Sequence, residues 1–278
     1  MVHRIVVLAV LLAACSVAYA LLLARFEVST APVEAEFGVP VAEAGIGLYL
    51  QPIAIDPADN SLEMRVSVTP AAAGAVAVAD RNVLVEVGRG TQTEHVRIHA
   101  GAPLPEVTFT LDLDEGNVRD YPLDRYVSAI TLAAAEGDGT GQSLPIHVTA
   151  WEGLLDYIVT GQAVAGPEAG APQLRFSIRR TGAAAIFGIA IYGAMAVMAL
   201  CALVIGGLVF IGIRRIEVTF AGALGAVIFA LPALRSALPG APPLGVRLDI
   251  LVFFWAEIGA IIAFFLFVAA WARRGPRP

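Results

Sequence analysis

Four charged residues in the C-terminal third are of types that could relay an ion or a proton through a membrane or form an ion pair within it. They are Arg235, Arg247, Asp249 and Glu257. Glu257 interrupts an apolar run, where a carboxylate costs about 2.5 kcal/mol or more unless it is paired, neutralised or faces a cavity. Asp249 precedes it by eight residues, so both acids lie on nearly the same face of a helix. We predict an intramembrane polar cluster, which acts as a relay or, in the interpretation that we favour, as an interhelical ion pair or hydrogen bond.

A second group of polar residues lies farther upstream. Residues His95, Arg97 and His99 alternate along a predicted strand and therefore share one face. Two histidines on one face could ligate a metal ion, but Arg97 repels a cation and no third ligand is apparent in the sequence. We predict a solvated polar face and no metal site.

A run of acidic residues has the composition of a calcium-binding loop. It contains Asp112, Asp114, Glu115, Asn117 and Asp120 around Gly116. The calcium loop requires glycine at its sixth position, whereas Gly116 occupies the fifth. A hairpin turn with Gly116 at positive φ explains the same residues, and loose binding of a divalent cation is the alternative.

The sequence contains no motif that predicts catalysis. The glycine-rich segment Glu136–Gly141 lacks the Lys-Ser/Thr of a phosphate-binding loop, and no Gly-x-Ser-x-Gly elbow occurs. Both cysteines, Cys15 and Cys201, lie in apolar runs, so we expect no disulfide in the region between them. We therefore predict no catalytic residues, no cofactor and no enzymatic activity.

The elements that position these residues have the composition of a membrane protein. Hydrophobic residues make up 58% of the 278 residues and charged residues only 15%, against about 25% in soluble domains. Between residues 25 and 182 there are 21 acidic residues and 10 arginines, although the whole chain has a net charge of −6. Such an acidic region repels nucleic acid. All 18 basic residues are arginine, which suggests a GC-rich, actinobacterial source.

The first apolar run, Ile5–Leu23, is uncharged over 19 residues, which is enough to cross about 30 Å of hydrocarbon. Three interpretations apply. The segment Ser16-Val-Ala-Tyr-Ala20 could be a signal-peptide cleavage site, and Leu12-Ala-Ala-Cys15 could direct lipidation of Cys15. We favour a retained anchor, because the sequence after both motifs remains apolar as far as Leu23.

Three further apolar segments predict transmembrane helices at about residues 183–213, 218–234 and 250–271. Arginines are enriched in cytoplasmic loops. Six of them fall on one side if both termini are cytoplasmic, namely Arg4, Arg214, Arg215, Arg273, Arg274 and Arg277. Arg179 and Arg180 oppose this orientation, and we interpret them as headgroup anchors whose stems snorkel.

Between residues 33 and 180 the hydrophobic pattern has the period of two that is typical of strands. Nine strands are predicted, at residues 47–55, 62–68, 82–87, 95–99, 107–113, 126–133, 146–151, 157–163 and 174–178. Asp56–Ser61 predicts a turn between the first two. Short strands separated by Gly and Pro are typical of a β-sandwich.

These patterns together predict a mixed membrane protein with an extracytoplasmic, all-β, sandwich-like domain and four transmembrane α-helices, one N-terminal and three C-terminal. Residues 1–24 form the anchor, residues 25–182 the β domain, and residues 183–278 the three-helix domain with a cytoplasmic tail. The expected location is the plasma membrane, with multiple crossings and both termini in the cytoplasm.

Two motifs carry a family resemblance. The first is Tyr121-Pro-Leu-Asp-Arg-Tyr126, and the second runs from Arg235 to Asp249 and continues into Phe253-Phe-Trp-Ala-Glu257. Together they resemble the uncharacterised bacterial membrane-protein family called domain of unknown function 4436, over nearly the whole chain. The residues that we expect to shape these motifs are Tyr121, Pro122, Asp124 and Tyr126 in a rigid corner, and Pro239, Gly240, Pro242, Pro243 and Gly245 in a stiff interhelical hairpin.

A second likeness is weaker. The Tyr-Pro-x-Asp corner, followed by Phe176-Ser-Ile-Arg-Arg180 and a membrane helix, looks similar to pentameric ligand-gated ion channels. Those channels have four helices after the β-sandwich and a proline in the first, whereas here three are predicted and residues 183–213 contain no proline.

The function that we expect is that of a non-enzymatic accessory or scaffold protein. Its β domain would bind a protein partner of the membrane or envelope, its helices would contact the lipid bilayer, and nucleic acid is not an expected partner. The alternative is a channel, transporter or sensor subunit that uses Glu257.

Overall fold

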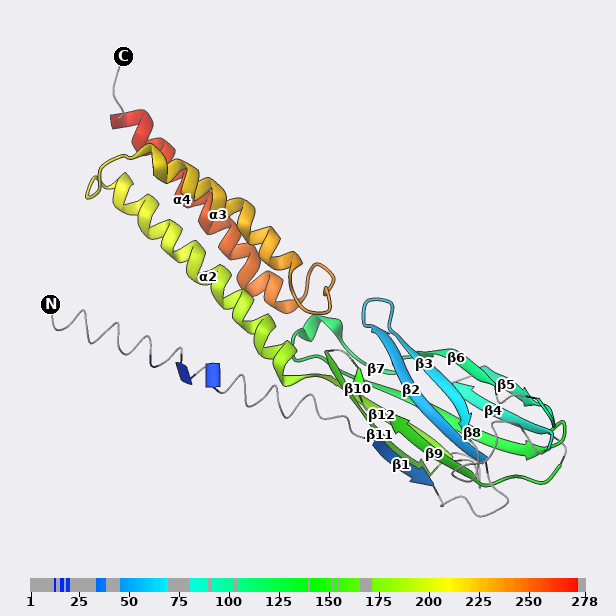
Figure 1. Ribbon diagram of the computed structural model, residues 1–278. Helices are drawn as coiled ribbons and strands as arrows, with labels where there is room; N and C mark the ends of the chain where they lie inside the picture. The colour runs from blue at the N-terminus through cyan, green and yellow to red at the C-terminus, as the bar shows by residue number, and fades with distance from the viewer. Residues whose placement is uncertain are drawn as a thin grey trace. The chain divides into compact units, whose positions relative to one another are not determined.

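The structure, a computed structural model, describes residues 13, 16–17, 19–20, 34–38, 46–69, 81–89, 92–102, 105–139, 141–151, 153–154, 156–165 and 172–274. The chain divides into two compact units (Figure 1). The β unit contains Met1–Asn117 and Asp124–Thr181, and the helical unit contains Val118–Leu123 and Gly182–Pro278. Most of the predicted anchor, Ile5–Leu23, lies outside the described residues, so the structure does not test it.

The β unit is built from two sheets. Its described strands are β1 (Glu34–Gly38), β2 (Ile46–Asp56), β3 (Ser61–Thr69), β4 (Val83–Arg89), β5 (Gln92–Ile98), β6 (Glu106–Asp112), β7 (Glu115–Gly116), β8 (Arg125–Glu136), β9 (Ile146–Trp151), β10 (Gly153–Leu154), β11 (Tyr157–Ala165) and β12 (Pro172–Arg180). One sheet has the order β1-β9-β2-β3-β6, and the other has β10-β11-β12-β8-β4-β5 with β7 beside β8. The pairing of β2 with β9 is parallel.

The two sheets share one hydrophobic core, which is formed by the inward-facing residues of each strand. In β8, Tyr126, Ser128, Ile130 and Leu132 point inward, and the residues that alternate with them are partly exposed. Leu50 from one sheet and Phe176 from the other belong to the same hydrophobic cluster. Because successive side chains of a strand face opposite sides, the period-two pattern correctly predicted a β-rich region of two sheets.

All nine predicted strands occur, and the turn at Asp56–Ser61 joins β2 to β3. The Asp56 carboxylate accepts hydrogen bonds from the backbone N–H groups of Ala58 and Asp59. Three described strands were missed, namely β1, β7 and β10. Strands β7 and β10 have two residues each, which is too short to show alternation. Strand β1 reads Glu-Ala-Glu-Phe-Gly, and these residue types are mostly disfavoured in strands.

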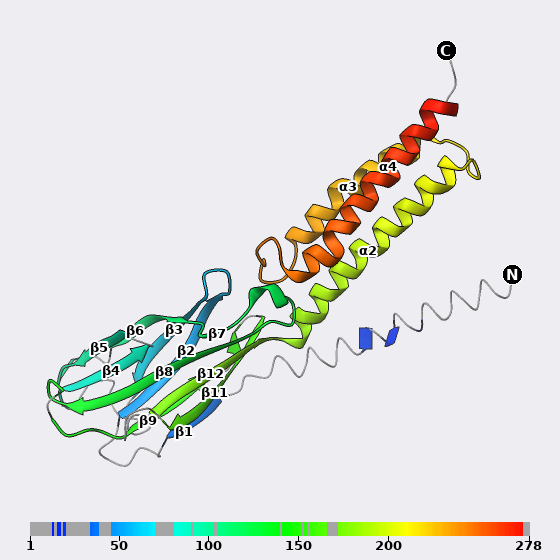
Figure 2. The same cartoon turned by 180° about the vertical axis from the view of Figure 1, so that it is seen from behind.

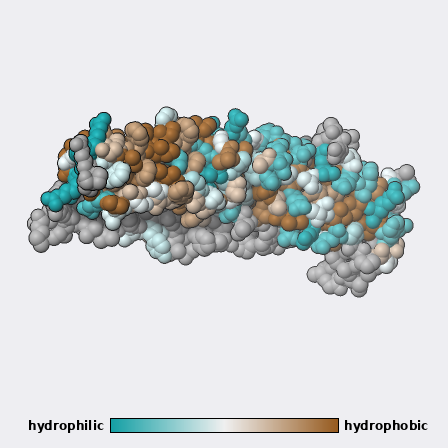
Figure 3. Space-filling model, turned by 90° about the horizontal axis from the view of Figure 1, so that it is seen from above, coloured by the Kyte–Doolittle hydropathy of each residue, from teal (hydrophilic) through white to brown (hydrophobic). Residues whose placement is uncertain are grey.

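The helical unit contains α2 (Gly182–Phe210), α3 (Val218–Ser236) and α4 (Phe254–Arg274). A π-helical turn, Asp249–Phe253, leads directly into α4. Within the described residues, three helical segments are long and apolar enough to cross a membrane: α2, α3 and Asp249–Arg274. Helix α2 has 29 residues, a length of about 43 Å at 1.5 Å per residue. Figure 3 shows hydrophobic residues concentrated over this part of the chain.

The helices pack side by side in both ribbon views (Figures 1 and 2). Small residues allow α2 and α4 to approach closely, because a Cβ added at Gly206 would lie 2.4 Å from the Ala263 carbonyl oxygen. Helix α2 ends at Phe210, before the predicted end at Ile213. Gly212 adopts a φ of +87°, and this left-handed conformation terminates helices.

Candidate functional site

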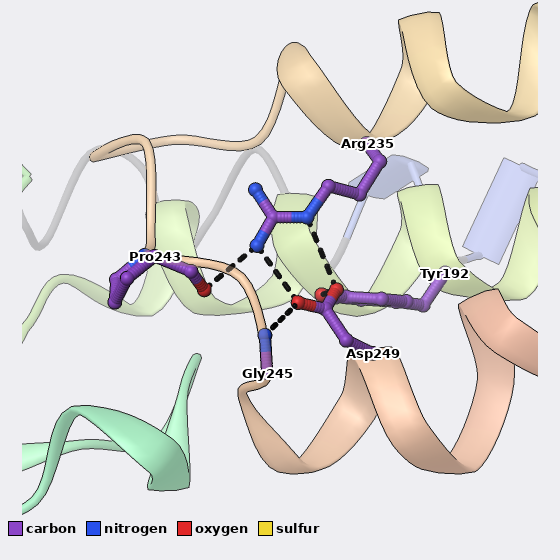
Figure 4. Close-up of polar contacts among 5 residues, drawn as sticks. All are labelled: Tyr192, Arg235, Pro243, Gly245 and Asp249. Carbon is purple, nitrogen blue, oxygen red and sulfur yellow. Dashed lines mark hydrogen bonds and ion pairs between the residues drawn. The ribbon is translucent and has the colours of Figure 1, made fainter.

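The best-defined polar site in the helical unit is a buried ion pair between Arg235 and Asp249 (Figure 4). The Arg235 Nε donates to Asp249 Oδ1 at 3.1 Å, and Arg235 Nη2 donates to Asp249 Oδ2 at 2.8 Å. Two further donors reach the same carboxylate. Tyr192 Oη lies 2.7 Å from Oδ1, and the Gly245 N–H lies 3.0 Å from Oδ2.

The local fold explains how these groups meet. Arg235 lies in the last turn of α3 and Asp249 in the turn that precedes α4. The hairpin between them bends back because Gly240 and Gly245 have positive φ values of +68° and +95°. Arg235 Nη2 also donates to the Pro243 carbonyl at 2.8 Å, so the ion pair holds the hairpin at two backbone points. These residues form the stiff interhelical hairpin of the second sequence motif.

This arrangement limits what Asp249 can do chemically. An ionised carboxylate offers about four acceptor positions, and Asp249 uses four for Arg235, Tyr192 and Gly245. The carboxylate therefore has no position left for a metal ion or a transported cation. Removing one partner of a buried ion pair is strongly destabilising. We therefore interpret the pair as a structural lock, an ion pair that stabilises the hairpin between α3 and α4.

The other two members of the predicted cluster lie elsewhere. Arg247 pairs with Asp120 at 2.9 Å, and these side chains are 68% and 43% exposed. Glu257 follows Asp249 by about 12 Å of helix at 1.5 Å per residue. Its Oε2 is buried and has no hydrogen-bond partner among the described residues. The structure thus brings Arg235 and Asp249 together, and it leaves Arg247 and Glu257 apart from them.

The Tyr121–Tyr126 corner is divided between the two units. Tyr121 is buried in the helical unit, in a cluster with Ile191, Tyr192 and Met195. It needs Gly188 of α2, since a Cβ there would lie 2.9 Å from Tyr121 Oη and 3.2 Å from Pro122 Cβ. Val118–Asp120 forms a short 3₁₀ helix before it. Tyr121 and Pro122 are therefore packed within the helical unit, whereas Asp124 and Tyr126 belong to the β unit.

The remaining half of the corner forms a buried site in the β unit that sequence reasoning missed. Asp124 Oδ1 accepts a hydrogen bond from Arg180 Nε at 2.6 Å, and the two side chains are 0% and 1% exposed. Tyr126 Oη donates to Asp124 Oδ2 at 2.8 Å. The Arg180 guanidinium lies 4.7 Å from the centre of the Tyr157 ring, within the range of a cation–π interaction.

The interpretation of Arg180 as a snorkelling headgroup anchor is therefore wrong. Leu174, Phe176 and Ile178 point into the core, and Arg180 continues their alternation, so the pattern itself could have placed it inside. Arg179 has the opposite phase and is exposed. The partner, Asp124, could not be identified because it lies 56 residues away in the chain.

Two tyrosines of this site are held in the protonated state. Burial, together with the hydrogen bond to Asp124 and its negative charge, raises the pKa of Tyr126 far above its usual value. Burial also raises the pKa of Tyr157, although the nearby Arg180 charge acts in the opposite direction. Both phenols are therefore neutral under physiological conditions.

The other candidate groups lie on the surface of the β unit. His95, Arg97 and His99 are all exposed, as predicted for a solvated polar face, and His95 Nδ1 lies 3.3 Å from Glu86. In the acidic run, Glu115 pairs with Arg175 at 2.9 Å. Gly116 has the predicted positive φ, +137°. It lies in strand β7, however, and the chain turns only after this strand. No cluster of metal-ligating side chains occurs among the residues described.

A two-sheet β region is followed by three helices that are long and apolar enough to cross a membrane, which suggests a membrane protein. The family model described as Domain of unknown function (DUF4436) matches residues 36–178, and the chain belongs to this family. The resemblance inferred from the two motifs is confirmed for that region. The helical part, residues 180–274, matches a separate model, Domain of unknown function (DUF8686). No curated protein matches the chain.

Proposed function

We propose that this chain is a non-enzymatic membrane protein of the cell envelope, an accessory or scaffold subunit whose β unit binds a protein partner. The observation that carries the proposal is that two buried aspartates are engaged by neighbouring groups of the protein. Asp249 is engaged by Arg235, Tyr192 and Gly245, and Asp124 is engaged by Arg180 and Tyr126. These groups stiffen each unit, and a stiff unit loses little conformational entropy when it docks on a partner.

The charge of the β region indicates the chemistry of that partner. Residues 25–182 carry 21 acidic residues against 10 arginines, and two of the buried charges, Asp124 and Arg180, cancel each other. The excess of negative charge favours a partner with a basic surface, because complementary charges accelerate association and exclude wrong partners. Binding should therefore weaken as the salt concentration rises.

The proposed orientation places the β unit outside the cytoplasm. Arg214 and Arg215 follow α2, and Arg273 and Arg274 end α4, where Arg274 donates to the Val209 carbonyl at the end of α2. Arginines gathered at one end of a helical unit favour a cytoplasmic location for that end. The N-terminal segment is proposed to be a fourth, retained helix, so that both termini are cytoplasmic in the plasma membrane.

A purification experiment tests the scaffold role. The tagged full chain is extracted in mild detergent, and stoichiometric partners are identified at low and high salt. A variant that neutralises exposed acids on neighbouring strands, Glu63→Gln with Asp112→Asn, should lose much of the partner. Glu217→Gln, outside the β unit, serves as the control. A partner-free monomer from native membranes, or equal recovery with all variants, would contradict the proposal.

The second candidate function is a channel, transporter or sensor, and Glu257 favours it. Its Oε2 is buried without a hydrogen-bond partner in the described part of the chain, so a mobile cation or proton is one way to neutralise it. The test is ion flux into liposomes that contain the full chain. Glu257→Gln should change the flux and Glu217→Gln should not, and an absence of flux in all forms rejects this candidate.

A further inference from the structure

The end of the helical unit that carries Arg273 and Arg274 is organised by specific contacts. Arg274 Nη2 donates to the carbonyl groups of Val209 and Phe210, the last carbonyls of α2. The Val209 carbonyl also accepts from the Gly212 N–H at 3.2 Å, and neither carbonyl has a partner within the helix, so Arg274 helps to cap α2. The Arg273 guanidinium lies 5.6 Å from the centre of the Phe210 ring. Two arginines of α4 are thereby held against the end of α2.

The loop after α2 brings two more arginines to the same place. The Arg214 N–H donates to the Leu208 carbonyl at 3.1 Å, which fixes the backbone where Arg214 and Arg215 follow each other. Gly212 makes room for α4, because a Cβ added there would lie 2.5 Å from Arg274 Nη1. Its φ of +87° also favours glycine. The four arginine positions are therefore set by backbone and ring contacts.

The charge of this arginine cluster, Arg214, Arg215, Arg273 and Arg274, is not neutralised by any acidic residue in the described part of the chain. None of the four forms an ion pair with a described acid, and all four are exposed. The other two arginines of the described helical residues after Gly182, Arg235 and Arg247, are both paired with aspartates. These positive charges at one end of the helical unit can be neutralised by an anion that is not part of the chain.

The surroundings of the cluster indicate where that anion comes from. Ile211, Ile213 and Val218 are exposed beside the arginines, and Trp271 is exposed on α4 one turn before its end. Exposed tryptophan at a helix end is typical of the membrane–water interface. Exposed apolar side chains next to guanidinium groups match a molecule that has both an acyl chain and a negatively charged headgroup.

We propose that the arginine cluster binds the phosphate of an anionic phospholipid headgroup. Guanidinium groups bind phosphate oxygens with two parallel hydrogen bonds. Arg274 uses Nη2 for the α2 carbonyls, so it can offer a phosphate only single hydrogen bonds from Nε or Nη1, and two parallel hydrogen bonds must come from the other arginines. Arg214, Arg215 and Arg273 supply the remaining positive charge, and Gly212 is a positioning residue that admits Arg274.

Lipid retention by the full chain in detergent tests this site. Native mass spectrometry counts bound lipids after exchange with phosphatidylglycerol or with zwitterionic phosphatidylcholine. Phosphatidylglycerol should be retained preferentially, and each of Arg214→Gln and Arg273→Gln should lower its affinity about fivefold, as expected for one surface arginine near anionic lipid. Gly212→Ala should also weaken retention by displacing Arg274. Arg247→Gln, which removes a paired arginine, is the matched control.

Three results would overturn the proposal. The first is equal retention of both lipids, and the second is an equal loss in Arg247→Gln and Arg273→Gln. The third is competition: if inorganic phosphate at millimolar concentration displaces phosphatidylglycerol completely, the cluster is a site for free phosphate rather than for lipid. Unchanged circular dichroism of each variant ensures that a loss of lipid reflects the site and not unfolding.

Discussion

The buried pair of Asp124 and Arg180 yields the sharpest prediction. Asp124→Leu leaves the Arg180 charge without a counter-ion in a site where its side chain is 1% exposed. Removing one partner of such a pair costs about 3–5 kcal/mol of unfolding free energy, and Arg180→Met should cost a similar amount. In the double variant no charge is left buried, and the main loss is the acceptor of the Tyr126 hydroxyl, about 1–3 kcal/mol. The two single effects should therefore be strongly non-additive.

The assay is urea unfolding of the full chain in mild detergent, followed by tryptophan fluorescence. The chain has three tryptophans, and replacing Trp255 and Trp271 by phenylalanine leaves Trp151 as the reporter for the β unit. Glu115→Gln, which breaks the half-exposed pair with Arg175, is the control and should cost less than about 1 kcal/mol. If the double variant loses the sum of the two single effects, within about 0.5 kcal/mol, the pair is not coupled and the reasoning fails.

Three other predictions concern the two buried aspartate sites and the packing of α2 against α4. Because the pKa of Tyr126 is raised in the fold, its stabilising effect is complete below the unfolded pKa of about 10 and falls by about 1.4 kcal/mol per pH unit above it; alkaline melts monitored by circular dichroism should show a shallower decline for Tyr126→Phe. In the helical unit, Asp249→Asn should cost about 3 kcal/mol by leaving Arg235 unpaired, whereas Arg247→Gln should cost less than about 1 kcal/mol; thermal unfolding in detergent that ranks them equally refutes the lock. Gly206→Ala should cost about 1–3 kcal/mol by forcing α2 from α4, while its neighbour Gly207, with no atom within 4 Å of an added Cβ, should accept alanine with little change.

Periodic hydrophobic patterns predicted most strands and the helices of this chain. Contacts between residues that are far apart in the sequence could not be predicted. Alternation identified the nine longer strands because each buries one face, and apolar runs identified α2, α3 and α4 because each is long and apolar enough to cross a membrane. Strands of two residues carry no period, so β7 and β10 were missed. The two ends of the motif from Arg235 to Asp249 meet in the structure, and they are close in sequence.

The polar sites were predicted only where the partners are near in sequence. Arg235 and Asp249 are 14 residues apart and meet, whereas Tyr192 joins them from 57 residues away. No local pattern links Arg247 to Asp120 or Arg180 to Asp124, because these pairs depend on how the strands and helices pack. Residue type alone was misleading for Arg180, since an arginine before a membrane helix is usually a surface residue.

The division of the Tyr121–Tyr126 corner affects how the chain can be cut. The backbone passes between the two units at Asn117/Val118, at Leu123/Asp124 and at Thr181/Gly182, so no single cleavage separates them. A secreted fragment that ended at Thr181 would carry Tyr121 without Ile191, Tyr192 and Met195, which normally bury it. Tyr121 would then be exposed beside Leu123, which is already exposed. The fragment should self-associate through this apolar surface. Replacing Val118–Leu123 by a polar linker should give a soluble fragment, suitable for partner screening without detergent.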